Sequence, residues 1–173
     1  MTYRWFVSAV VLACVAALSL PSAHAQFFGD VGGEVRGEYG AWKLRCDTIP
    51  GARDEQCAIT QYVTAADREN VGLSVVFLRT ADKQAELLRV LAPLGVYLTT
   101  GLGLRIDSEE IGQVAFQRCL PNGCFVEVSL DETLLAKFRA GSEALFIINE
   151  IPTEGIGIPI SLEGFSAGFD ALP

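Results

Sequence analysis

The sequence predicts a mainly β protein, a β-sandwich of about seven to nine short strands with one short helix. Short segments of alternating apolar and polar residues recur along the chain, and a period of two is typical of half-buried strands. Turn residues such as Pro50-Gly51 and Asn122-Gly123 separate these segments. Because only one segment has the apolar spacing of a helix, the pattern favours two packed sheets.

The first 25 residues have the pattern of a secretory signal peptide. Arg4 precedes a long apolar run over 5–20, and residues 23–25, Ala-His-Ala, have the small-x-small pattern of a cleavage site. The run is short for a membrane span, so we expect cleavage near Ala25 and export to the periplasm or the outer envelope. Lipoprotein processing at Cys14 is the alternative, which Leu12 disfavours because a lipobox has a small residue there.

We therefore divide the chain into a signal peptide (1–25), a flexible N-terminal arm (26–40) and one β-sandwich domain (41–173). The arm is rich in glycine and has little periodicity. Without Arg4, the mature chain has 12 Lys and Arg residues against 21 Asp and Glu residues, a net charge of −9. Such an acidic chain repels phosphate, so nucleic acid and anionic lipid are poor partners, and no membrane span is expected after signal cleavage.

The first two strands are expected at 42–46 and 56–63, joined by the polar loop Asp47–Glu55. In the first strand, Trp42, Leu44 and Cys46 share one face because basic residues alternate with them. Further strands are expected at 71–78, 86–91, 104–107, 114–118, 125–129 and 145–149, with a short edge-like segment at 96–99 and a last extended run at 155–165.

Four cysteines remain after signal cleavage, and an even number in an exported chain predicts disulfides. We pair Cys46 with Cys57 and Cys119 with Cys124, because each pair flanks one tight excursion between two extended segments. The second excursion contains Pro-Asn-Gly, which predicts a β-hairpin turn. A four-thiolate zinc site is the alternative, but these spacings differ from those of paired C-x₂-C knuckles.

One helix of about two turns is expected near 131–139. Leu134, Leu135 and Phe138 fall on one helical face. The segment that begins with Ser129 fits a capping box, and Gly141 stands where a left-handed C-terminal cap would be.

The residues needed for most catalysis are missing from the mature chain. Its only histidine, His24, lies in the signal peptide, which removes histidine bases and histidine metal sites. The expected disulfides remove thiolate nucleophiles as well. We therefore expect no enzyme, no cofactor and no metal site. A glycoside hydrolase that uses two opposed carboxylates is the remaining enzymatic alternative.

Two short motifs have simpler structural interpretations. Asp107, Glu109 and Glu110 lack the spacing of a calcium loop, so we expect a solvated loop. Gly101 and Gly103 lack the third glycine and the helix of a dinucleotide motif, which indicates a strand bend.

Aromatic and basic residues near the N-terminus could contact partners, yet each has a structural interpretation. Tyr39, Trp42, Phe27 and Phe28 could form an exposed patch. We expect Trp42 in the core instead, and Phe27-Phe28 in the flexible arm. Lys43-x-Arg45 is expected on an outward polar strand face rather than in an anion site.

Several motifs, specific in combination, extend from Gly40 to Leu172. They are Trp42-x-x-x-Cys46-Asp47, Cys57, Ala92-Pro93-Leu94-Gly95-Val96, Gly101, Ile106-Asp107, Arg118-Cys119, Gly123-Cys124, Ile160-Ser161-Leu162-x-Gly164-Phe165 and Phe169. Together they resemble the invasion-associated locus B family of exported proteins in Gram-negative bacteria, except that Ala92 stands where valine is expected.

The resemblance implies an immunoglobulin-like β-sandwich, a periplasmic or surface location, and an association with host-cell invasion in pathogenic members. It supplies no catalytic residues. The expected function is a protein-interaction module whose partners lie in the bacterial envelope or on host cells, with the arm 26–40 and the loop 47–55 as candidate contact regions. A small-molecule or lipid carrier is the alternative, and it requires a sizeable apolar cavity between the sheets.

Overall fold

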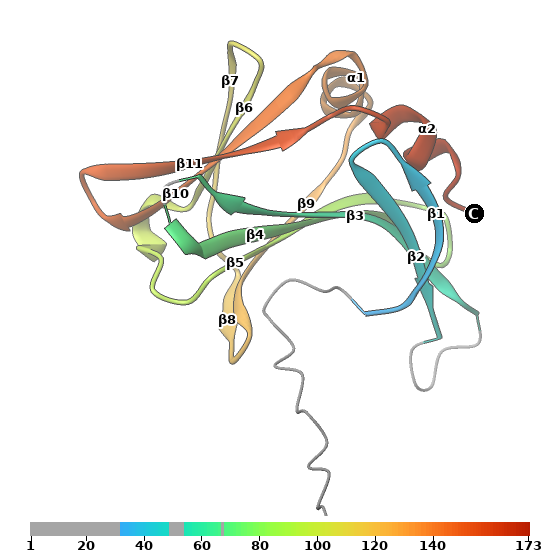
Figure 1. Ribbon diagram of the computed structural model, residues 1–173, viewed down its shortest axis with the longest axis horizontal. Helices are drawn as coiled ribbons and strands as arrows, with labels where there is room; N and C mark the ends of the chain where they lie inside the picture. The colour runs from blue at the N-terminus through green and yellow to red at the C-terminus, as the bar shows by residue number, and fades with distance from the viewer. Residues whose placement is uncertain (1–31, 49–53, 67) are drawn as a thin grey trace, which may run out of the picture.

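Two antiparallel sheets pack face to face in this protein (Figure 1). The structure is a computed structural model, and it describes residues 32–48, 54–66 and 68–173. The larger sheet contains β1 (Glu34–Tyr39), β2 (Trp42–Asp47), β3 (Gln56–Ala65), β4 (Arg68–Arg79), β5 (Glu86–Ala92), β8 (Arg118–Leu120) and β9 (Gly123–Ser129). The smaller sheet contains β6 (Leu102–Ile106), β7 (Glu109–Val114), β10 (Glu143–Ile151) and β11 (Glu154–Ser161).

The order of strands is β1-β2-β3-β4-β5-β9-β8 in the larger sheet and β11-β10-β6-β7 in the smaller sheet. The predicted two-sheet architecture is confirmed, but the described residues form eleven strands, more than the seven to nine expected. The chain crosses to the smaller sheet after β5, returns to the larger sheet after β7, and crosses again through a helix after β9.

The first extra strand corrects the assignment of 26–40 to a flexible arm. Residues 34–39 form β1, which pairs antiparallel with β2. Most of β1 is exposed, and charged Glu34, Arg36 and Glu38 alternate with its other residues. An edge strand of this kind has almost no apolar periodicity, because charged side chains protect such edges. Only Val35 and Tyr39 are apolar in this alternation, so the strand signal is weak. Residues 26–31 of the arm lie outside the described residues.

Three further expectations concern where the chain turns. The strand expected at 114–118 is wrong, because β7 ends at Val114 and residues 115–117 cross to the other sheet. The edge-like segment at 96–99 is wrong as well, since a 3-10 helix forms at Leu98–Thr100. The last extended run ends at Ser161, and a second helix, α2 (Phe165–Asp170), follows. Gly164 starts α2 at φ 79°, where a Cβ would lie 2.2 Å from the carbonyl oxygen of Tyr39.

The predicted helix is present as α1 (Glu132–Ala140), but its ends differ from the expectation. The Asp131 carboxylate, not Ser129, caps it by accepting a 2.7 Å hydrogen bond from the Leu134 amide. Gly141 is extended at φ −76° rather than left-handed. A Cβ there would lie 2.6 Å from Cγ2 of Ile106, so close packing, not backbone conformation, requires a glycine.

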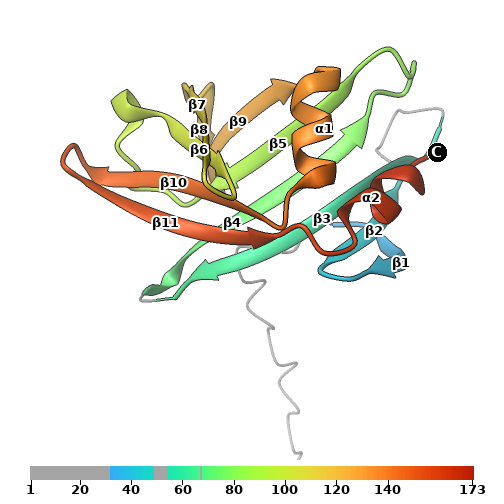
Figure 2. The same cartoon turned by 90° about the horizontal axis from the view of Figure 1, so that it is seen from above.

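The two helices cover the larger sheet beside the smaller one (Figure 2), and an aromatic cluster forms the part of the core that lies there. Its members are the fully buried Trp42, Phe77, Phe138, Phe165 and Phe169. The ring of Phe77 lies 4.8–6.4 Å from the other four rings, edge to face with each. Edge-to-face contact adds to the stabilisation from burial, so this cluster joins β2, β4, α1 and α2.

A buried glutamine joins the two sheets near this cluster. The side-chain amide of Gln61 donates to the Ser161 carbonyl oxygen at 2.9 Å, and the Ser161 amide donates to the Gln61 side-chain oxygen at 3.1 Å. The Trp42 indole N–H donates to the same Ser161 carbonyl at 3.1 Å. Gln61 therefore satisfies the hydrogen-bonding groups of the β11 backbone at Ser161 from the opposite sheet. These hydrogen bonds explain why the polar side chain of Gln61 can be only 9% exposed.

Gln61→Leu is expected to lower the free energy of unfolding by about 1–3 kcal/mol, because the Ser161 amide loses its partner. Urea unfolding of the mature protein measures this loss. The control Gln84→Leu, in the exposed β4–β5 turn, should change the value little. Equal effects of the two substitutions would contradict the assigned role of Gln61.

Two arginines hold the C-terminal helix against the sandwich. The guanidinium groups of Arg79 and Arg139 lie 5.1 and 5.3 Å from the centroid of the Phe169 ring. Arg139 donates to the Asp170 carboxylate at 2.6 Å, and Arg79 donates to the Leu172 carbonyl oxygen at 2.8 Å. The pKa of Asp170 lies below its usual 3.8, chiefly because of the hydrogen bond from Arg139, with a smaller effect from the positive charge of Arg79.

Because the pKa of Asp170 is lower in the folded state than in the unfolded state, its ion pair stabilises the fold at pH values above the unfolded-state pKa. This stability is lost as the pH falls through the folded-state pKa. The melting temperature of the wild type should therefore fall more steeply than that of Asp170→Asn as pH drops below 3.8. Thermal unfolding of both proteins between neutral and strongly acidic pH measures this. Parallel curves would show that the ion pair contributes nothing.

Candidate functional site

The disulfides lie where the sequence pattern placed them. Cys46 and Cys57 face each other across β2 and β3, with their sulfur atoms 2.06 Å apart. Cys119 and Cys124 face each other across β8 and β9, at 2.02 Å. The first pair is buried, and the second ties a hairpin whose tip is exposed. These pairs fix two hairpins of the larger sheet.

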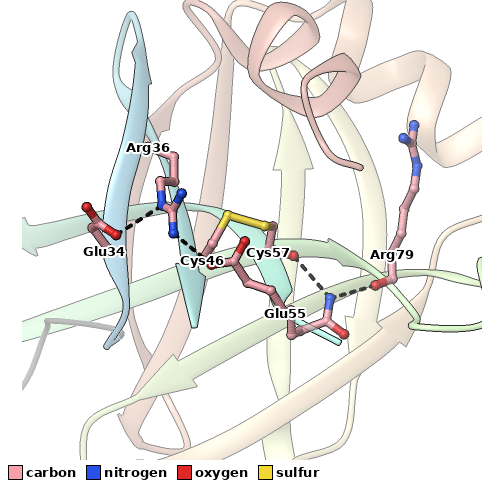
Figure 3. Close-up of a disulfide and its surroundings, with 7 residues drawn as sticks. Glu34, Arg36, Cys46, Glu55, Cys57 and Arg79 are labelled. Atoms are coloured by element: carbon pink, nitrogen blue, oxygen red, sulfur yellow. Dashed lines mark hydrogen bonds and ion pairs between the residues drawn. A yellow bond between two sulfur atoms is a disulfide. The ribbon is translucent and has the colours of Figure 1, made fainter. Parts of the chain in front are cut away.

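Charged side chains surround the first disulfide (Figure 3). Arg36 of β1 contacts Glu34 at 3.1 Å and Glu55 at 2.9 Å. The Glu55 carboxylate and both sulfur atoms lie within 4.8 Å of one another. This arrangement resembles a metal site only by distance, because a sulfur atom in a disulfide is not a thiolate ligand. Its effect is to connect β1 to the β2–β3 hairpin.

The acidic residues at 107–110 have separate structural positions. The Asp107 carboxylate accepts hydrogen bonds from the amides of Ser142 and Glu143, both at 3.1 Å, and so fixes the start of β10. Glu109 pairs with Lys137 of α1. Glu109 and Glu110 belong to β7 rather than to the expected loop. These carboxylates do not converge as calcium ligands would.

Gly101, Trp42 and Lys43 have the structural roles expected of them. Gly101 bends the chain at φ 67°, where a Cβ would lie 2.4 Å from the Val114 carbonyl oxygen. Trp42 is in the core, and Lys43 is exposed beside Glu38 at 3.9 Å. Phe27 and Phe28, like residues 49–53 of the candidate contact loop, lie outside the described residues.

An apolar cleft opens between the sheets on the side of β7, and no sequence motif indicated it. Its volume is about 160 Å³. One wall comes from β5 and β9, the other from β6, β7 and β10, and Leu134 of α1 also lines the cleft. Its lining residues are Leu88, Val90, Leu102, Leu104, Ile111, Gly112, Gln113, Val114, Val126, Val128, Leu134 and Phe146.

The chemistry of this cleft follows from its lining. Gln113 is the one lining residue with a polar side chain, and no carboxylate lines the cleft. The cleft therefore offers a ligand mainly the burial of apolar surface. Several lining side chains, among them Leu104, Ile111 and Val128, are only half-buried, so the cleft is open to an incoming group.

A second apolar surface lies at one end of the sandwich. The Tyr97 amide donates to the Asn149 carbonyl oxygen at 2.6 Å, which places the loop after β5 beside the end of β10. Leu94, Leu98 and Ile151 are each at least half exposed there, at 55, 51 and 50%. Arg68 pairs nearby with Glu150 and Glu154. A group of exposed apolar side chains rimmed by charges is typical of contact surfaces.

No helix in the described part of the chain is long and apolar enough to cross a membrane.

Comparison with known proteins supports one family. The family model described as "Invasion associated locus B (IalB) protein" matches residues 42–173. Two invasion protein B homologs of Brucella abortus, from strain 2308 and from biovar 1 strain 9-941, are each 26% identical over 157 residues. Those alignments cover 90% of this chain and 89% of each relative.

The fold is also shared with a solved structure. The crystal structure of invasion associated protein B from Bartonella henselae superposes with a TM-score of 0.63 at 20% sequence identity. The match covers 78% of this chain and 91% of that chain.

Proposed function

This chain belongs to the invasion associated locus B family, and from that premise we propose that it is an exported, non-enzymatic envelope protein that binds other proteins. Its partners would lie in the bacterial envelope or, in a pathogen, on the host cell. In that setting the protein would support entry into host cells, as the names of its Brucella relatives suggest for those proteins.

The observation that carries the proposal is the small size and open form of the apolar cleft. Pockets that enclose drug-sized ligands have volumes of roughly 300–1,000 Å³, whereas this cleft has about 160 Å³. It is therefore too small to hold a lipid chain or a cofactor, but large enough for one apolar side chain of a partner. The exposed apolar end near Ile151 offers a second contact surface.

The chemistry of the described residues supports a binding role over catalysis. All four mature cysteines are in disulfides, and the mature sequence has no histidine. A glycoside hydrolase needs two carboxylates that face each other across an aromatic-lined cleft. No carboxylate lines the cleft between the sheets. We therefore place the glycoside hydrolase last among the alternatives.

An extracytoplasmic location is supported by two features. The N-terminal residues have the pattern of a signal peptide, and disulfides persist in oxidising compartments. A small-molecule carrier remains the second candidate function, because the same apolar cleft could take a compact apolar molecule.

Crosslinking of the tagged protein in living cells, combined with native mass spectrometry of the purified protein, tests the proposal. We expect recurrent capture of the same envelope proteins and a native mass that equals the mature chain. A co-purified apolar molecule, together with no reproducible protein capture, would favour the carrier and contradict the interaction module.

A further inference from the structure

The outer edge of β7 is unusual among the four sheet edges of this fold. Among the described residues, no strand pairs with β7 on the side away from β6. The edge at β11 contains Pro159 and is bonded to the other sheet through Ser161. The edge at β8 is three residues long and closed by a disulfide. The β7 edge alone borders the apolar cleft, through Ile111, Gly112, Gln113 and Val114.

The position of this edge determines what an added strand would contact. A new strand would lie about 4.8 Å from β7, and its alternate side chains would point toward the larger sheet. There they would meet Val128, which is half-buried in the opposite wall of the cleft. A cavity of about 150 Å³ holds benzene, so 160 Å³ can take one large apolar side chain such as phenylalanine.

Charge restricts the class of strand further. Glu109 and Glu110 are exposed at the start of β7. Glu109 already pairs with Lys137, while no ion pair of Glu110 occurs among the described residues. The whole chain has a net charge of −8. A strand with basic residues at its ends would therefore be attracted, and an acidic strand repelled.

A second copy of this chain is a poorer occupant. Suppose that the β7 strands of two copies paired with each other. The apolar side chains of each β7 strand, Ile111 and Val114, already line the cleft of the copy to which they belong. Neither copy would contribute a free side chain to fill the other cleft. The unfilled cleft beside the edge therefore favours a different polypeptide.

We propose that β7 is the docking edge for an extended segment of a partner protein, which adds to the smaller sheet as a fifth strand. The segment carries a large apolar residue that enters the cleft and basic residues beside Glu109 and Glu110. Strand addition obtains affinity from main-chain hydrogen bonds and specificity from pockets for alternate side chains. This inference rests on the proposed binding function, since it names the surface and the chemistry of the partner.

Synthetic peptides test the inference on the mature protein. The probe alternates threonine and valine over the length of β7, six residues, with a central phenylalanine and a lysine at each end. A second peptide has alanine in place of the phenylalanine, and a third has prolines that prevent strand pairing. We expect the alanine peptide to bind at least about tenfold more weakly, the proline peptide not to bind, and the probe to slow hydrogen exchange of the amides at 109–114.

Substitutions in the protein provide the matching half of the test. Val128→Phe narrows the cleft and should weaken probe binding at least about tenfold. Glu110→Lys changes only an exposed side chain, so it should fold normally and weaken binding about two- to fivefold at low salt. Glu163→Lys makes the same charge change at an exposed position outside the cleft and should leave binding unchanged.

The outcomes separate this inference from the proposed function. No binding of the probe below about 1 mM, equal binding of the probe and alanine peptides, protection away from β7, or a β7-linked dimer would each overturn the docking edge. If crosslinking in cells still captured envelope proteins, the binding function would stand and only the edge would be wrong. If the probe bound as expected but nothing was captured in cells, β7 would still accept an added strand in the purified protein, but the proposed binding function would fall and the inferred partner with it.

Discussion

Phe77→Ala is expected to lower the free energy of unfolding by about 4 kcal/mol, the largest effect of any substitution considered for this fold. Phe77 is fully buried and contacts the rings of Trp42, Phe138, Phe165 and Phe169 edge to face. Alanine removes these contacts and leaves a cavity between β4 and both helices. Because the rigid strands around it cannot collapse into the space, most of the cost should remain.

Urea unfolding of the mature protein measures this effect. The control is Phe125→Ala, the same chemical change on a half-buried residue of β9, for which a clearly smaller loss is expected. If both substitutions cost the same, the aromatic cluster would not be the centre of the core.

Removal of the Cys46–Cys57 disulfide is the second large effect that we expect. The paired substitution Cys46→Ala with Cys57→Ala should lower the free energy of unfolding by about 3 kcal/mol, and the pair Cys119→Ala with Cys124→Ala by about 2 kcal/mol. The difference follows from loop length, because the bonds span 11 and 5 residues of sequence. A longer closed loop restricts the unfolded chain more.

The same unfolding experiment, without reductant, compares the two paired variants with the wild type. A loss of stability in neither variant would contradict a structural role for the bonds. A larger loss for the Cys119–Cys124 pair would show that native contacts, rather than loop length, determine the contribution.

The parts of this fold that the sequence predicts are those with strong local signals. The strand at Trp42, both disulfides and the helix at 132–140 follow from alternation, paired cysteines and helical spacing. The strand β1 was missed because it is an exposed edge, and α2 because it is only six residues long. In β1 only Val35 and Tyr39 are apolar, and the six residues of α2 are too few to establish a helical period.

The candidate site was missed for a different reason. The cleft exists because residues far apart in sequence, from Leu88 to Phe146, meet between the two sheets. The smaller sheet covers the larger one incompletely at this place. Its edge strand, 109–114, was not predicted, because residues 107–110 were expected to form a solvated loop and the strand expected at 114–118 was assigned to the hairpin with 125–129. Alternation continues through residues 114–118 although the chain changes sheets there, so a period of two cannot locate the crossing. The bulge between Leu104 and Arg105 in the β6–β7 pairing gave no sequence signal either.

Site-specific photocrosslinking in living cells tests the central claim, that this protein acts by binding another protein, most directly. A photoreactive residue is placed at Gln113, at the cleft beside the β7 edge, and in a separate variant at Lys83, in the exposed β4–β5 turn. We expect one or a few envelope proteins to be captured reproducibly from position 113 and not from position 83, with capture reduced by Glu110→Lys. Equal, nonspecific capture from both positions, or none from either, would contradict the claim.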